Sequence, residues 1–188
     1  RQAWEITTGS ASNTIAVIDG GVDFTHIDLR GKTWINGDEV SGNRRDDDGN
    51  GFIDDINGWD FVDNKTAQTS HSHATHVAGL AAASSNNGQG VAGVDWQARV
   101  MSVRVLNRFG VGREADIAAG ISYAASNGAK IINLSIAGSA SSLIKEAIET
   151  AYASGVVVVA AAGNSGRDTG LYPIAPVCSE PADVDMVL

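Results

Sequence analysis

Residues 15–23 read Ile-Ala-Val-Ile-Asp-Gly-Gly-Val-Asp, a run of apolar residues that ends on an acid and two glycines. The segment 14–18 is short and has no polar alternation, which is typical of a strand covered on both faces of a sheet. Three further runs have the same character, at 100–106, 130–134 and 156–161. We expect these segments to be parallel strands of one sheet.

Helical patterns lie between these runs, at 75–83, 114–126 and 142–154. Ser141 or Ser142 can cap the start of the last helix, and Gly155 can end it. The alternation predicts one α/β domain over residues 1–188, with a three-layer, doubly wound, mostly parallel sheet and helices on both faces. Functional side chains gather at the carboxyl ends of such strands, and Asp19, Ser135 and Asn164 each follow a predicted strand.

Composition excludes several classes of function. The net charge of −9 argues against a nucleic-acid partner, because phosphate contacts need clustered lysine and arginine. No apolar run approaches the ~20 residues that span a bilayer, so we expect no membrane segment. The single cysteine, Cys178, excludes an internal disulfide and has no activating neighbour, which favours an ordinary thiol.

The excursion at 31–70 is strongly acidic and too long to be an idle loop. Within it, Asp46, Asp48, Asn50 and Asp54 stand at positions 1, 3, 5 and 9 of a calcium loop. Position 12 is Asn57 instead of glutamate, and no flanking helix is evident, so we predict a Ca²⁺-binding loop that is not an EF-hand. A solvated acidic turn is the alternative.

Three of the four histidines, His71, His73 and His76, fall within six residues before a predicted helix. Asp19 and His73 are the residue types of an orienting acid and a general base. Taken alone, Asp19 also fits an ordinary turn or helix cap. The H-x-H-x-x-H spacing offers a further alternative, a zinc-dependent hydrolase, but it lacks an obvious fourth ligand.

Four ordered motifs resemble those of the subtilisin-like serine proteases. IAVIDGGVD resembles their aspartate motif, HATHVAG (73–79) their histidine motif, INLSIAG (132–138) their substrate-pairing strand, and AAAGNSG (160–166) their oxyanion-asparagine segment. The resemblance implies a serine endopeptidase with Asp19 as orienting acid, His73 as base and Asn164 as oxyanion donor. It also implies substrate-binding walls for an extended polypeptide, formed by Gly110, Gly112, Ser135, Ile136, Ala137, Ala162 and Gly163.

The chain departs from the family pattern at several positions. Gly20 stands where the family has a hydroxyl residue that bonds the aspartate, Ala74 follows the histidine in place of glycine, and Ala137 adds a methyl group at the substrate strand. The family's G-T-S-M-A serine motif is absent. We therefore expect a domain incomplete at its carboxyl end, inactive alone, whose serine lies in another segment; the alternative is a non-catalytic binding or regulatory module.

The resemblance implies further partners. His26-Ile27-Asp28-Leu29 is similar to the family's H-P-D-L, which implies a second Ca²⁺ site with Asp28 and Asn87 as ligands. It also implies an extracellular, secreted protein and a propeptide. Because removing strands from a sheet exposes apolar edge, we expect the chain to need the missing segment, or to self-associate through that edge.

Overall fold

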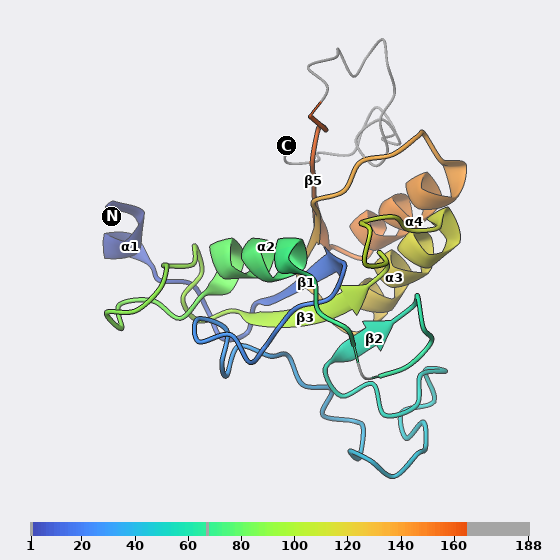
Figure 1. The fold of residues 1–188 in the computed structure, drawn as a ribbon, viewed down its shortest axis with the longest axis horizontal. Coiled ribbons are helices and arrows are strands. Elements are labelled where there is room, and N and C mark those ends of the chain that lie inside the picture. Colours follow the sequence, from blue (N-terminus) through green and yellow to red (C-terminus); the bar gives the residue numbers. More distant parts are fainter. Residues whose placement is uncertain (1, 67, 165–188) are drawn as a thin grey trace.

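The computed structural model describes residues 2–66 and 68–164, and its five strands form one parallel sheet. The order across the sheet is β2-β3-β1-β4-β5, so β1 is central and lies between β3 and β4 (Figure 1). The strands are β1 Thr14–Asp19, β2 Gly58–Asp60, β3 Arg99–Arg104, β4 Ile131–Leu134 and β5 Val157–Ala160. The α/β class with a parallel sheet, predicted from the alternation of patterns, is confirmed.

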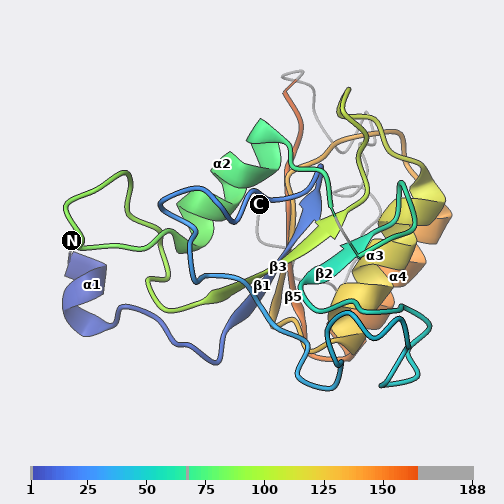
Figure 2. The same cartoon turned by 60° about the horizontal axis from the view of Figure 1, so that its bottom comes forward.

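The helices cover both faces of the sheet, as predicted. Helix α2 (Ser72–Ala82) lies on one face and packs its alanines against β1 and β3. Helices α3 (Glu114–Ser126) and α4 (Ser142–Ala153) lie together on the other face (Figure 2). A short helix, α1 (Gln2–Ile6), precedes β1 and was not predicted. None of the described helices is long and apolar enough to cross a membrane.

The ends of α4 agree with the predicted caps, whereas the start of α2 differs from the prediction. Ser141 caps α4 by accepting from the main-chain N–H of Ile144, and Gly155 follows the helix with φ 82°. Helix α2 begins at Ser72, earlier than the expected start at residue 75, because His71 acts as its N-cap. The histidine run therefore forms the first turn of the helix.

Strand β2 was not predicted, because Gly58-Trp59-Asp60 is too short to show a pattern. Gly58 has φ 115°, and a Cβ there would lie within 1.9 Å of the Ser102 carbonyl oxygen on β3. Glycine is thus required for this close approach of two backbones. It lets a three-residue strand pair with β3 and close that edge of the sheet.

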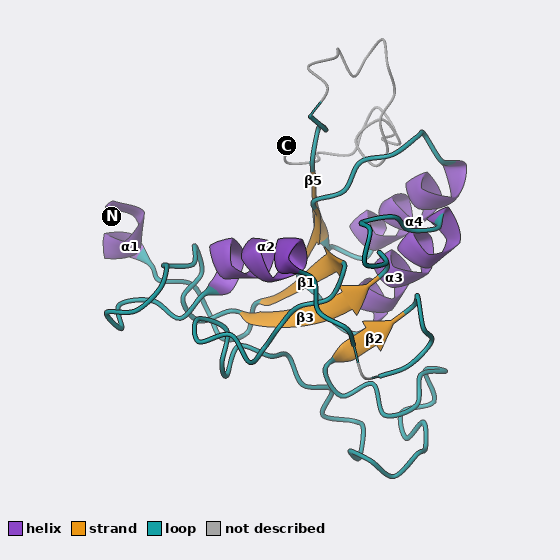
Figure 3. Ribbon diagram, in the orientation of Figure 1, coloured by secondary structure: helices purple, strands orange, loops and turns teal. Residues whose placement is uncertain are grey.

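The acidic excursion, residues 31–70, is almost entirely loop; it contains β2 and ends just before α2 (Figure 3). Its apolar anchor is a group of edge-to-face aromatic rings formed by Phe52, Trp59, Phe61 and Tyr123. Tyr123 belongs to α3, so the rings attach the excursion to the α3–α4 side of the sheet. Such pairs add stability beyond their buried area.

The two faces of β4 and β5 differ in burial. Ile132, Leu134, Val158 and Ala160 are buried in the core beneath α3 and α4. The alternate residues, which point to the α2 side, are half-buried or exposed; they are Ile131, Asn133, Val157 and Val159. Within residues 2–66 and 68–164, this side of β4 and β5 is only partly covered.

Candidate active site

Asp19 and His73 meet at the carboxyl end of the central strand. Asp19 ends β1 with 1% of its surface exposed, and His73 lies in the first turn of α2 with its side chain half exposed. His73 Nδ1 lies 2.7 Å from Asp19 Oδ2. Because a carboxylate can only accept, Nδ1 carries the proton and Nε2 keeps a free lone pair. The pair is thus an oriented imidazole whose second nitrogen can take a proton.

The second carboxylate oxygen of Asp19 also has a donor. Its Oδ1 accepts from the main-chain N–H of Gly20 at 2.6 Å. Gly20 was expected to leave this carboxylate without the hydroxyl donor typical of the family. The backbone supplies a donor in its place, so both oxygens of the buried acid are held.

A cleft of about 680 Å³ opens beside this pair. Its lining includes Asp19, His73 and five of the predicted wall residues, Gly110, Gly112, Ser135, Ile136 and Ala137. The five wall residues come from two loops, one after β3 and one after β4. The cleft therefore lies at the carboxyl edge of the sheet, where a parallel sheet gathers its functional groups.

Asn164 lines the same cleft and follows β5. The predicted neighbours Ala162 and Gly163 lie in the same segment, although they do not line the cleft. The carboxyl ends of four strands, β1, β3, β4 and β5, thus contribute an acid, two walls and an amide to one cavity. The lining also includes the apolar side chains of Leu106, Ile117 and Ile144.

No serine is bonded to the base within residues 2–66 and 68–164. The described partners of His73 are Asp19 and, through its main chain, His71. Ser135 lines the cleft, but its hydroxyl accepts from Asn133 Nδ2 at 2.9 Å, on the strand that precedes it. Ser165, Ser179 and Cys178 lie outside the described residues.

The three histidines do not form a metal cluster. His71 Nδ1 accepts from the main chain of α2, and His73 Nδ1 is bonded to Asp19. Among the described residues, the group of three acidic or histidine ligands that come within reach of one ion contains no histidine. The sequence spacing that suggested zinc therefore has no counterpart in the arrangement of these side chains.

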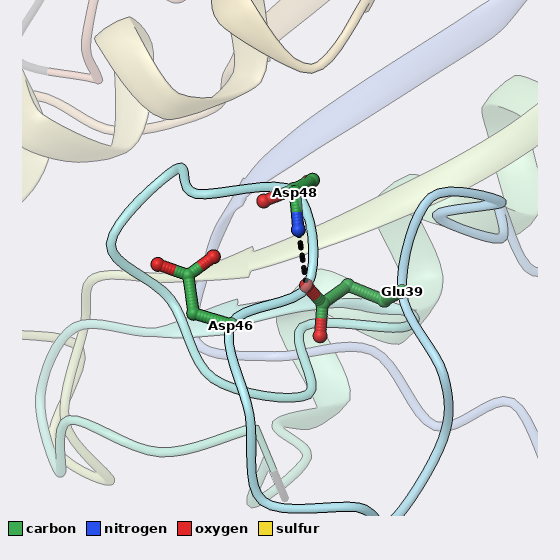
Figure 4. Close-up of side chains that lie close together, drawn as sticks. All are labelled: Glu39, Asp46 and Asp48. Carbon is green, nitrogen blue, oxygen red and sulfur yellow. Dashed lines mark hydrogen bonds between the residues drawn. The ribbon is translucent and has the colours of Figure 1, made fainter.

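The cluster that could hold a metal lies in the acidic excursion and consists of Glu39, Asp46 and Asp48. One oxygen of each lies within 4.8 Å of the others, and the side chains point into the interior of the loop (Figure 4). Sequence analysis identified Asp46 and Asp48 but missed Glu39, which precedes the motif. Its oxygens accept from the main chain at Asp47, Asp48 and Asp54, which fold the loop around it.

The other two predicted ligands of this loop have local hydrogen bonds. Asp54 accepts from the main chain of residues 42–44, so it caps a turn. Asn50 donates to Asp48 and to the buried Asp55. Asp55 is fully buried and also accepts from Asn36 and from the Tyr123 hydroxyl at 2.6 Å. Burial, and then this carboxylate, raise the pKa of Tyr123 well above its usual value.

The second predicted metal position contains a carboxylate with an unpartnered oxygen. Asp28 is buried, its Oδ2 accepts from the N–H of Val91, and its Oδ1 has no described partner. The 85–93 loop passes so close that a Cβ on Gly90 would lie 1.9 Å from Oδ1. Asn87 lies in this loop and accepts from the N–H of Gln89.

A buried ion pair stabilises the β2–β3 edge. Arg104 Nη1 lies 2.5 Å from Asp60 and 2.8 Å from Asp63. Burial alone would lower the pKa of Arg104, but these two carboxylates raise it. The Arg104 hydrogen bond, and then Lys65, lower the pKa of Asp63. These acids have cationic partners, whereas the ion pairs of the described residues include none for Glu39, Asp46 or Asp48.

Comparison with known proteins agrees with this geometry. A family model described as "Subtilase family" matches residues 10–183. The chain is 43% identical over 173 residues to a thermophilic serine proteinase of Bacillus sp. (strain AK1), covering 91% of this chain and 38% of that protein. It is 42% identical over 174 residues to thermitase of Thermoactinomyces vulgaris, covering 92% and 54%.

A solved structure gives the same result. A cold-adapted subtilisin-like serine proteinase superimposes with a TM-score of 0.65 at 29% identity, covering 89% of this chain and 52% of that one. The chain thus spans about half the length, or less, of the relatives that it matches.

Proposed function

The chain belongs to the subtilase family, and from that premise we propose that it supplies the acid, the base and an oxyanion donor of a serine endopeptidase. The observation that carries the proposal is the 2.7 Å contact between His73 Nδ1 and the buried Asp19 at the wall of the cleft. Asp19 has only 1% of its surface exposed, and its ion-pair partner among the described residues is His73. Its function is to hold the imidazole.

In this mechanism His73 Nε2 takes the proton of a serine hydroxyl as that oxygen attacks the peptide carbonyl carbon. The same nitrogen then gives the proton to the leaving amine. Asp19 stabilises the imidazolium and fixes the tautomer. These roles are known from subtilisin, which belongs to the same family as this chain.

Asn164 is the proposed donor to the oxyanion. It lines the same cleft as Asp19 and His73, and a side-chain amide can donate to the oxygen that becomes negative in the tetrahedral intermediate. The wall segments 110–112 and 135–137 flank the cleft, and their main chains offer edges to which an extended peptide can add as a strand.

We further propose that the nucleophilic serine comes from a segment outside the described residues. The partly covered side of β4 and β5 supports this, because Val157 is 46% exposed there and Ile131 and Val159 are half-buried. A parallel sheet is normally covered on both faces. A segment packed on this side would lie next to α2 and could bring a serine to His73.

A fluorophosphonate probe tests the proposal directly, since it labels only an activated serine. In the complete gene product, we expect one adduct by intact mass, lost in His73→Ala and kept in His76→Ala. The second variant removes an exposed histidine one turn further along α2. Absence of the adduct in the unmodified complete protein, with retained binding of extended peptides, would contradict catalysis and identify a binding module.

We propose that Ca²⁺ stabilises the acidic excursion. Glu39 is buried beside Asp46 and Asp48, and the described ion pairs join none of the three to a lysine or arginine. The oxygens of these three carboxylates suit a hard cation. Bound there, Ca²⁺ would supply a positive charge that the described ion pairs do not give this cluster.

Asp28 is the proposed ligand of a second Ca²⁺. Leaving a buried carboxylate oxygen without a donor is costly, so the orphaned Oδ1 fits a cation better than an empty space. The 85–93 loop, which contains Asn87, passes close to Asp28 at Gly90 and Val91. We assign this ion a structural role, because Asp28 is not part of the cleft lining.

Extracellular action is the remaining part of the proposal. One relative, 39% identical over 159 residues, is a cell wall-associated protease of Bacillus subtilis. Calcium dependence also fits a compartment in which the ion is abundant. We expect a propeptide and export of the complete gene product, which mass spectrometry of culture medium would detect.

A further inference from the structure

Gly20 follows Asp19, and a neighbouring side chain explains why this position is a glycine. Its φ is not among the positive values of the chain, so the backbone itself does not require glycine there. A Cβ on Gly20 would instead lie 2.7 Å from His71 Cβ and 3.1 Å from His71 Cγ. The near end of the His71 side chain therefore occupies the space that any larger residue at position 20 would need.

His71 is bonded on both sides of the acid–base pair. Its main-chain N–H donates to the Gly21 carbonyl at 2.8 Å, in the segment just after Asp19. Its Nδ1 accepts from the main-chain N–H of His73 at 3.1 Å. Its carbonyl oxygen accepts from both the N–H and the hydroxyl of Thr75 at 3.0 Å. One residue thus links the end of β1 to the first turn of α2.

We propose that His71 is a positioning residue for the Asp19–His73 pair, acting as the N-cap of α2 and as a packing partner of Gly20. The proposal rests on the role proposed above for that pair. Since Nδ1 accepts, the neutral imidazole carries its proton on Nε2. His71 makes no contact with Asp19 or with the ring of His73 among the described hydrogen bonds, so it acts through the backbone.

The contacts of Gly20 and His71 take the place of the hydroxyl side chain that the family pattern implies at position 20. A hydroxyl there would hold the acid through its side chain. Here the N–H of Gly20 holds Asp19, and His71 fixes the distance between that segment and the helix of the base. Histidine is an uncommon cap, and its ring supplies both an acceptor and a surface that packs on the bare glycine.

The tautomer of His73 measures this positioning without requiring activity. In protein labelled with ¹⁵N-histidine, ring nitrogen shifts report whether Nδ1 or Nε2 carries the proton. We expect Nδ1–H to dominate in the unmodified protein and in His71→Asn, which keeps a capping acceptor. In His71→Leu the ratio of tautomers should fall by up to about fivefold, the factor reached when the whole ~1 kcal/mol of a typical N-cap is lost from the contact of His73 Nδ1 with Asp19. His76→Leu is the matched control and should leave the ratio unchanged.

A double-mutant cycle covers the case in which His71→Leu fails to fold. Gly20→Ala should disturb the His73 tautomer in the unmodified background and should have little effect in His71→Gly, which removes the colliding Cβ. An unchanged tautomer in His71→Leu, a loss in His71→Asn equal to that in His71→Leu, or additive effects in the cycle would each overturn the proposal. Absence of Nδ1–H in the unmodified protein would instead refute the Asp19–His73 pair, and with it the proposed function.

Discussion

Replacing Tyr123 by phenylalanine removes one hydroxyl from the joint between the acidic excursion and α3. That hydroxyl donates at 2.6 Å to Asp55, a carboxylate with no exposed surface. A hydrogen bond to a charged group contributes about 1.5–3 kcal/mol, and losing it leaves part of a buried charge unsatisfied. Asn36 and Asn50 still donate to Asp55 in the variant, so we expect a loss of about 2 kcal/mol, near the lower part of that range.

Thermal and urea unfolding measure this loss. For a domain of this size about 2 kcal/mol corresponds to a fall of roughly 4–8 °C in Tm. Tyr152→Phe is the matched control, because that side chain is 41% exposed and its hydroxyl has no described partner. It should change the free energy of unfolding by less than about 0.5 kcal/mol. Equal effects of the two variants would refute the assignment of stability to this joint.

Alkaline pH gives a second signature of the same contact. Burial and Asp55 raise the pKa of Tyr123 in the folded state, so its stabilising contribution is complete below the unfolded value near 10. Above that pH the unfolded chain loses the proton and the folded chain keeps it. The free energy of unfolding then falls by up to about 1.4 kcal/mol per pH unit. The gap between the unmodified protein and Tyr123→Phe should narrow above pH 10, and a constant gap would contradict the shift.

Three further predictions follow from other contacts. Arg104→Met should destabilise the protein by about 3–5 kcal/mol in urea unfolding, because it leaves Asp60 buried without its cation; Asp60→Asn added to that variant should restore part of the loss. Calcium should raise the Tm of the unmodified protein, and a chelator should lower it; Asp28→Asn should reduce the number of bound ions measured by calorimetry, and an unchanged number would exclude this ligand. In the complete gene product, Asp19→Asn should slow peptide hydrolysis about 10⁴-fold without changing the fold by circular dichroism, since the imidazole loses its orienting acceptor; a loss below tenfold would contradict the role.

The parallel strands and the acid–base pair were predictable because each shows as a short pattern of consecutive residues. Segments 14–18 and 130–134 are short, rich in β-branched residues and without polar alternation, and the first of them is buried on both faces. This pattern alone predicts buried parallel strands. An acid at the end of one such strand and a histidine at a helix start then fall at the same edge of a parallel sheet. Topology brings together residues that are 54 positions apart in the sequence.

The unpredicted parts depend on contacts that are distant in sequence or unusual in type. Strand β2 exists because Gly58 lets its backbone approach Ser102, and three residues carry no periodic signal. Glu39 joins Asp46 and Asp48 from outside the motif, through main-chain bonds that no spacing encodes. His71 caps α2 although histidine is not a typical cap, so the helix began three residues before its expected start.

The position of Asp19 has a consequence for protein engineering. It ends the central strand, which is paired with β3 from Thr14 to Asp19 on one side and with β4 from Ile15 to Val17 on the other. A one-residue slip would reverse the face of every side chain on β1, so two neighbouring strands oppose any drift of the acid. The cleft walls at 110–112 and 135–137 belong to loops and lie outside the register of the sheet. Libraries of substitutions confined to those loops should therefore change the selectivity for peptide substrates without changing the contact between Asp19 and His73.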